Sequence, residues 1–155
     1  MPNWCNNRVT ISAGTVEEEK QLAEIVEIFK KDNPFQVLYP MPDFDKIPHP
    51  ETGELPVAEE IKNPAGEVVH VSTRWADGTQ DTRWYDWRTS HWDTKWDINE
   101  KDVEWCDEEG DYVTFSFDTA WAPPEGVVRE LRDKYPDVSI SWFYDEPGME
   151  FAGYL

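Results

Sequence analysis

The sequence is short of basic residues, cysteines and long apolar runs, and each shortage excludes a class of protein. Its 155 residues include 14 Lys and Arg against 33 Asp and Glu, for a formal net charge of -19. Because nucleic-acid backbones and anionic membranes bind basic faces, we expect neither as a direct partner. No apolar run approaches the roughly 20 residues that span a bilayer.

The two cysteines, Cys5 and Cys106, are far apart in sequence and have no metal-ligand spacing. We therefore expect no disulfide framework, no structural metal and no cofactor. This cysteine usage, together with a polar N-terminal stretch that has no signal pattern, predicts a cytoplasmic protein.

Catalytic motifs are also lacking. The sequence has no GxSxG, no glycine-rich phosphate loop and no HExxH. Cys5 is expected on the apolar side of a strand, where a thiol is inert. Pairs of carboxylates carry little information when 33 acids are present. We expect a protein that is not an enzyme.

The periodicity at both ends of the chain predicts alternating strands and helices. Alternation from Cys5 to Ser12 predicts a half-buried strand. Thr15 and Glu18 form a capping box before a helix that we expect to end at Asn33–Pro34. Later patterns predict a hairpin around 107–110, a helix opened by Pro123–Pro124, a strand over 138–144 and a short final strand over 149–154.

This order predicts an α+β fold of the ferredoxin-like, split βαβ type. Two helices should cover one face of an antiparallel sheet, with a C-terminal hairpin arm. We expect a single domain over 1–155, with a loop-rich, Trp-containing insertion at about 34–95 between the first helix and the second strand. Within it, 51–54 should be an exposed turn, and Val68, Val69 and Val71 should form a short strand before a turn at 75–78.

The segment from Arg83 to Trp96 holds four of the nine tryptophans. Trp84, Trp87 and His91 share one helical stripe, so we expect a helix ending near His91 and a strand from Thr94 to Ile98. The main interpretation is that its tryptophans fill space in the interior. The alternative is a platform for a small ligand or nucleotide, made by Arg83, Trp84, Trp87, Arg88, His91, Trp92 and Lys95.

A metal site is a further alternative. His91 with Asp93 and Asp97, joined by His49 or His70, offers suitable ligand types. The spacing matches no established motif, so a hydrogen-bonded His91 is the favoured interpretation.

Four phrases, MPNWCNNRVTI, YDWRTSHWDTKWD, FDTAWAPP and WFYDEPGMEFAGY, together resemble the YubB-type ferredoxin-like proteins, which are carried by bacteriophages and plasmids. The resemblance spans most of the chain and is weakest over 43–80. It implies the fold and a mobile-element origin, and it supplies no catalytic residues. One departure is Asp93, where the family typically has glycine before the threonine.

Acidic residues are concentrated after the tryptophans, with one lysine among eight acids from Asp97 to Asp111. The simplest interpretation is a solvated surface. We hypothesise instead that this face mimics a nucleic acid and binds a basic host or phage protein, as an inhibitor of a host nucleic-acid-binding or defence protein would. The predicted contact residues are Glu100, Asp102, Glu104, Asp107, Glu108, Glu109 and Asp111.

Overall fold

A computed structural model describes residues 2–155, apart from the side chains of residues 69–71. The chain forms two compact units, each described by itself. The first comprises Met1–Pro40 and Arg88–Leu155, and the second comprises Met41–Trp87. The second unit lies inside the range predicted for the insertion, whereas both ends of that range belong to the first unit.

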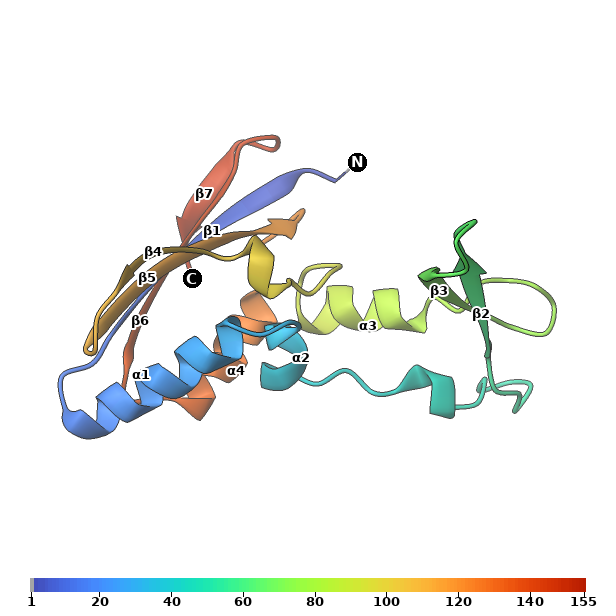
Figure 1. Ribbon diagram of the computed structural model, residues 1–155, viewed down its shortest axis with the longest axis horizontal. Coiled ribbons are helices and arrows are strands. Elements are labelled where there is room, and N and C mark those ends of the chain that lie inside the picture. The colour runs from blue at the N-terminus through green and yellow to red at the C-terminus, as the bar shows by residue number, and fades with distance from the viewer. Residues whose placement is uncertain (1) are drawn as a thin grey trace. The chain divides into compact units, whose positions relative to one another are not determined.

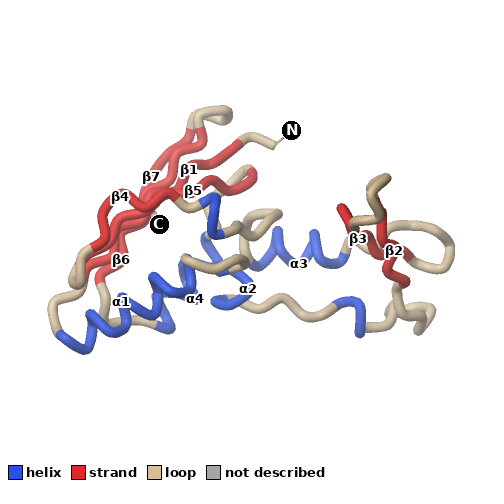
Figure 2. Tube along the Cα trace, in the orientation of Figure 1, coloured by secondary structure: helices blue, strands red, loops and turns tan. Residues whose placement is uncertain are grey.

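The first unit is built on a five-stranded antiparallel sheet (Figures 1 and 2). Its spatial order is β4-β5-β1-β6-β7. The first four are the strands of the predicted split βαβ fold, and the last is the predicted C-terminal arm added at the edge. The strands are β1 (Trp4–Ser12), β4 (Glu104–Glu108), β5 (Tyr112–Ala120), β6 (Ser139–Glu146) and β7 (Phe151–Tyr154).

Helices α1 (Val16–Phe29) and α4 (Glu125–Lys134) lie on one face of this sheet (Figure 1). The predicted cap of α1 is confirmed, since Thr15 accepts a hydrogen bond from the Glu18 backbone N–H at 3.2 Å. Glu18 in turn accepts from the Gly14 N–H at 2.6 Å. The helix predicted after Pro123–Pro124 is also confirmed, with Pro124 at its N-cap.

Aromatic rings fill the core between sheet and helices. Phe29 of α1 packs against Phe115 and Phe117 of β5, with ring centroids 4.9 and 5.9 Å apart. Phe117 also meets Trp142 of β6 edge-on at 5.6 Å. These rings are buried almost completely, so aromatic area supplies much of the apolar burial in a chain with modest aliphatic content.

One polar side chain crosses this core. Asn7 is fully buried and donates to the Thr119 hydroxyl at 2.8 Å. Its carbonyl oxygen accepts from the Trp142 indole N–H at 3.0 Å. The pattern of β1 placed Asn7 on the apolar face, and the structure shows that this is possible because its amide is hydrogen-bonded throughout.

Two features around the insertion differ from the sequence prediction. The first helix ends before Asn33–Pro34 as predicted, but Pro34 also begins an unpredicted short helix, α2 (Pro34–Leu38), which packs near α1 and α4. The strand predicted from Thr94 to Ile98 does not form, and that segment leads into a 3-10 helix, η2 (Glu100–Asp102). The reason is that Asp97 turns back to accept hydrogen bonds from Phe35 and Gln36 N–H, at 3.0 and 2.8 Å.

The second unit consists of a short 3-10 helix, a hairpin and the start of α3. Its elements are η1 (Phe44–Lys46), β2 (Val57–Lys62) and β3 (Val68–Arg74), and α3 (Arg83–His91) begins here and ends in the first unit. The strand expected at 68–71, the turns at 51–54 and 75–78 and the helix ending at His91 are confirmed. Strand β2 was not predicted, because all six of its residues are exposed and show no alternation.

None of the helices in the described part of the chain combines the length and apolar character needed to cross a membrane.

The N-terminus of α4 lies against the chain that leaves α3. The Gly126 N–H donates to the Asp93 carboxylate at 3.0 Å, and Asp93 itself adopts a left-handed conformation with φ of 67°. That conformation explains why glycine suits this position, and Asp tolerates it. Asp93 adds a helix cap that glycine lacks.

Replacing Gly126 by alanine should destabilise the first unit. A Cβ atom at Gly126 would stand 1.6 Å from the His91 carbonyl oxygen, which is backbone and can move only with α3. We expect a loss of about 1–3 kcal/mol or more in unfolding free energy, measured by urea denaturation. Gly110→Ala is the matched control, because a Cβ there meets nothing within 4 Å. Equal stability of the two variants would contradict the close approach.

The two thiols should differ sharply in reactivity. Burial, followed by the charge of Glu146, raises the pKa of Cys5 to about 11, whereas Cys106 is exposed. At about pH 8, near the ordinary cysteine pKa, a thiol reagent should label Cys106 rapidly and Cys5 only after denaturation. The check is mass spectrometry of the labelled native chain, with Cys106→Ser as control. Rapid labelling of both thiols would show that β1 is not buried as described.

Candidate functional site

The seven predicted partner-binding acids are all exposed and follow one another along η2, β4 and the turn into β5. We call this set the acidic strip; it comprises Glu100, Asp102, Glu104, Asp107, Glu108, Glu109 and Asp111. Strand β4 is the edge of the sheet, and its pairing with β5 shifts register between Trp105 and Asp107. Charges and an irregular register at an edge discourage pairing with another strand. A partner would therefore meet side chains here, not backbone.

Two members of the strip have partners within the chain. Asp102 completes a capping box with Asn99, and Glu108 forms an ion pair at 2.5 Å with Lys30, the residue that follows α1. Within the described residues, the other five carboxylates make no hydrogen bond or ion pair. Such carboxylates remain hydrated and available for a cationic partner.

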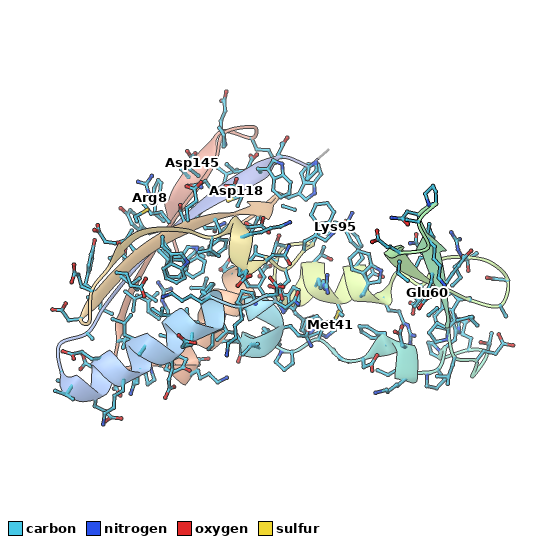
Figure 3. The ribbon with its side chains drawn as sticks, viewed as in Figure 1. Arg8, Met41, Glu60, Lys95, Asp118 and Asp145 are labelled. Atoms are coloured by element: carbon cyan, nitrogen blue, oxygen red, sulfur yellow. The ribbon has the colours of Figure 1, made fainter. Side chains whose placement is uncertain are left out.

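Strand register extends the acidic surface onto the face of the sheet opposite the helices. Glu104 pairs with Ser116 and Asp107 with Thr114, which alternate with the buried Phe115 and Phe117. Asp118 of β5 and Asp145 of β6 belong to the same face. Figure 3 shows these last two with Arg8 on the side of the sheet away from α1. Asp118 and Asp145 were missed in the sequence, since only strand pairing places them on the same face of the sheet, on either side of Asn6 of β1.

A pocket of about 440 Å³ opens beside the acidic strip. Trp4 at the start of β1 and Trp96 form its aromatic wall, with ring centroids 6.1 Å apart and planes inclined by 34°. These rings are 47% and 38% exposed. Two large apolar rings left open beside one another mark a surface suited to a ligand or partner.

Four carboxylates and one ammonium group line this pocket, from Asp97, Asp102, Glu104, Asp118 and Lys101. Asp118 accepts a hydrogen bond from the Asn6 amide at 3.0 Å. Burial raises the pKa of Asp97, an effect opposed by its hydrogen bonds from three backbone N–H groups and by Arg88. The lining is therefore both aromatic and predominantly acidic.

The seven residues of the predicted ligand platform are divided between the two units. Arg88, His91, Trp92 and Lys95 belong to the first, and Arg83, Trp84 and Trp87 to the second. Trp92 is fully buried, and its indole donates to the Tyr39 carbonyl at 2.8 Å. The packing interpretation is confirmed for Trp92. It is wrong for the exposed Trp96, while Trp84 and Trp87 are half-buried.

The cations of that segment are already engaged. Arg83 pairs with the buried Asp81 at 3.0 Å and donates to the Phe44 carbonyl at 2.8 Å. The Arg88 guanidinium lies 4.8 Å from the Trp92 ring centroid, and burial lowers its pKa. Lys95 lies 4.6 Å over Trp96. Arg83 and Arg88 thus serve the local packing.

The residues considered for a metal have other contacts. His91 shares a hydrogen bond with the Ser90 hydroxyl at 2.9 Å, while Asp93 and Asp97 cap backbone N–H groups. His49, in the second unit, accepts from the Glu51 and Thr52 N–H groups. The His70 side chain lies outside the described residues. Elsewhere in the described chain, no group of three or more His, Cys, Asp or Glu is arranged to hold a metal ion.

Comparisons with known proteins bear on the fold. Residues 91–155 match the family model described as the ferredoxin-like domain in Api92-like protein. The chain is similar to the crystal structure of protein Api92 from Yersinia pseudotuberculosis, with a TM-score of 0.51 over 99% of this chain and 93% of that chain. At 12% identity this likeness shows the fold alone. No curated protein matches the sequence.

These findings confirm the ferredoxin-like α+β fold. The family model that residues 91–155 match is that of Api92-like proteins, and the findings do not support a YubB-type family specifically.

The raised pKa of Asp97 implies that the stability of the protein depends on pH. A carboxyl whose pKa is higher in the folded chain contributes stability that is complete below its unfolded pKa, about 3.9, and is lost as pH rises through the folded pKa. Unfolding free energy relative to Asp97→Asn, which cannot titrate there, should therefore fall as pH rises above about 4. Denaturant titrations of both proteins across this range measure it.

Asp118→Asn controls for the change in net charge, since it removes an exposed carboxylate from the same pocket. If the unfolding free energy of wild type relative to Asp97→Asn rises with pH, the assignment of burial as the dominant effect on the Asp97 pKa is overturned.

Proposed function

We propose that this protein is a non-enzymatic acidic binding protein whose acidic strip docks onto the basic groove of a nucleic-acid-binding protein. The observation that carries the proposal is the continuous exposure of seven acids along η2, β4 and the following turn, five of them without a partner within the described chain. Asp118 and Asp145 widen this surface across the sheet.

Electrostatics gives this surface two properties. A net charge of -19 raises the association rate with a basic protein and keeps other acidic proteins away. The same attraction is screened over about 8 Å at physiological salt, so affinity should fall as salt rises. In the proposed complex, the carboxylates of the acidic strip occupy the positions that nucleic-acid phosphates take in the basic groove of the partner.

The resemblance to proteins of phages and plasmids suggests what such a partner would be. We propose a host nucleic-acid-binding or defence protein, with this chain as its inhibitor in the bacterial cytoplasm. The phrases WFYDEPGMEFAGY and FDTAWAPP carry that resemblance. It supplies the biological context, and the acidic strip supplies the contact.

Nucleotide binding by the tryptophan segment remains a separate prediction. The burial of Trp92 and the ion pair between Arg83 and Asp81 favour packing roles for these two residues. Titration of intrinsic fluorescence with mononucleotides and cyclic dinucleotides tests it, and a flat response would count against it.

Charge reversal on the strip should abolish capture of the partner. The immobilised protein should retain basic proteins from a bacterial lysate at about 50 mM salt and release them by about 500 mM. Excess double-stranded DNA should compete for the same partner. The variant Asp107→Lys/Glu109→Lys should retain little, because both carboxylates are exposed and without a partner in the described chain.

The matched control is Glu19→Lys/Glu27→Lys, which makes the same change in net charge on exposed positions of α1. It should retain the partner. If both variants lose the partner equally, the effect is one of net charge and the acidic strip is not the binding site. If binding is insensitive to salt and to DNA, the hypothesis of nucleic-acid mimicry is wrong.

A further inference from the structure

We infer that the pocket bounded by Trp4 and Trp96 receives an arginine side chain of the basic partner. This inference rests on the proposed function and deepens it by naming the group recognised. The acidic strip attracts a basic protein without discriminating among cations. The pocket adds a defined shape, a volume of about 440 Å³ and two aromatic rings next to the strip.

The rings favour a cation. The face of an indole carries negative charge, and cations stack on tryptophan more strongly than on other rings. Trp96 already shows this property, since the Lys95 ammonium lies 4.6 Å from its ring centroid. The rings of Trp4 and Trp96 are inclined by 34°, and 47% and 38% of their residue surfaces are exposed, so ring surface remains open to a cation in the pocket.

The carboxylates that line the pocket favour a positively charged ligand. Four acids against one lysine line the pocket, so a phosphate or carboxylate ligand would be repelled. Glu104 is the lining carboxylate left to accept from a ligand: it is exposed, and within residues 2–155 its side chain has no hydrogen bond or ion pair, whereas the other three carboxylates already accept hydrogen bonds. A neutral apolar ligand would leave these charges unused.

Arginine fits this combination better than lysine. Its guanidinium is planar, stacks on aromatic faces and presents paired N–H donors to a carboxylate. Lysine is a compact, strongly hydrated point charge that uses neither feature as well. A ring wall with a carboxylate at its edge therefore selects a guanidinium.

The pocket can be tested with a minimal probe, N-acetyl-arginine methylamide, followed through the indole N–H signals in nitrogen–proton NMR spectra. The signals of Trp4 and Trp96 should shift saturably, while those of the buried Trp92 and Trp142 stay in place. The citrulline analogue, which is nearly isosteric and uncharged, should cause no shift. The lysine analogue should bind about threefold to tenfold more weakly.

Two variants test whether the arginine probe binds in this pocket. Glu104→Gln and Trp4→Ala should each weaken binding of the arginine probe by about threefold to tenfold, and thermal unfolding checks that each variant is folded at the temperature of the titration. Trp121→Ala is the control for Trp4, since Trp121 is 49% exposed and does not line the pocket. It should bind as wild type.

Equal shifts with citrulline, or with adenosine monophosphate, would overturn the inference, as would an absence of any shift at saturating probe. Its failure is distinguishable from failure of the acidic strip. Lysate capture that is lost in Asp107→Lys/Glu109→Lys and retained in Trp4→Ala would leave the proposed function standing and remove the pocket from it, because neither lysine substitution touches the pocket lining.

Discussion

The packing of Phe117 holds the first unit together. Its ring lies within 6.2 Å, centroid to centroid, of Phe29, Phe35, Phe115 and Trp142. These rings come from α1, α2, β5 and β6, so one side chain joins both layers of the fold. Aromatic pairs at such separations stabilise beyond the area they bury. Together with the buried valines, isoleucines and leucines, this cluster supplies the apolar burial that offsets the self-repulsion of a large negative charge.

The same cluster decides which surface is left for binding. Because the helices cover the face that Phe115 and Phe117 occupy, the alternate residues of β4 and β5 point the other way. Acids at those positions cannot be buried, and they gather on one side as Glu104, Asp107 and Asp118. The acidic character of the open face therefore follows from where the rings are placed. Strand alternation thus places the aromatic residues on the buried face, where they stabilise the fold, and the acidic residues on the open face, where they are available to a partner.

Tryptophan has two uses in this protein. Trp92 and Trp142 are buried, and each indole N–H is satisfied, by the Tyr39 carbonyl and the Asn7 amide. Trp4 and Trp96 keep much of their area open beside carboxylates. Composition does not separate these uses. Trp142 pairs with the buried Val9 on the helix-covered face of the sheet, whereas Trp4 alternates with the buried Cys5 and so lies on the opposite face.

The sequence by itself determined the order of the strands and helices that make up the ferredoxin-like core of the first unit. Alternation along 5–12 and 113–117, the capping box at Thr15 and the Pro123–Pro124 start each act locally, through side chains a few residues apart. It also located the acidic strip, which is contiguous along the chain. Tertiary structure alone decided that Asp97 would cap α2 instead of joining a strand, since its partners Phe35 and Gln36 are about 60 residues away. It alone brought Trp4 against Trp96, because strand pairing and the turn at Asp93 join segments that no local pattern connects.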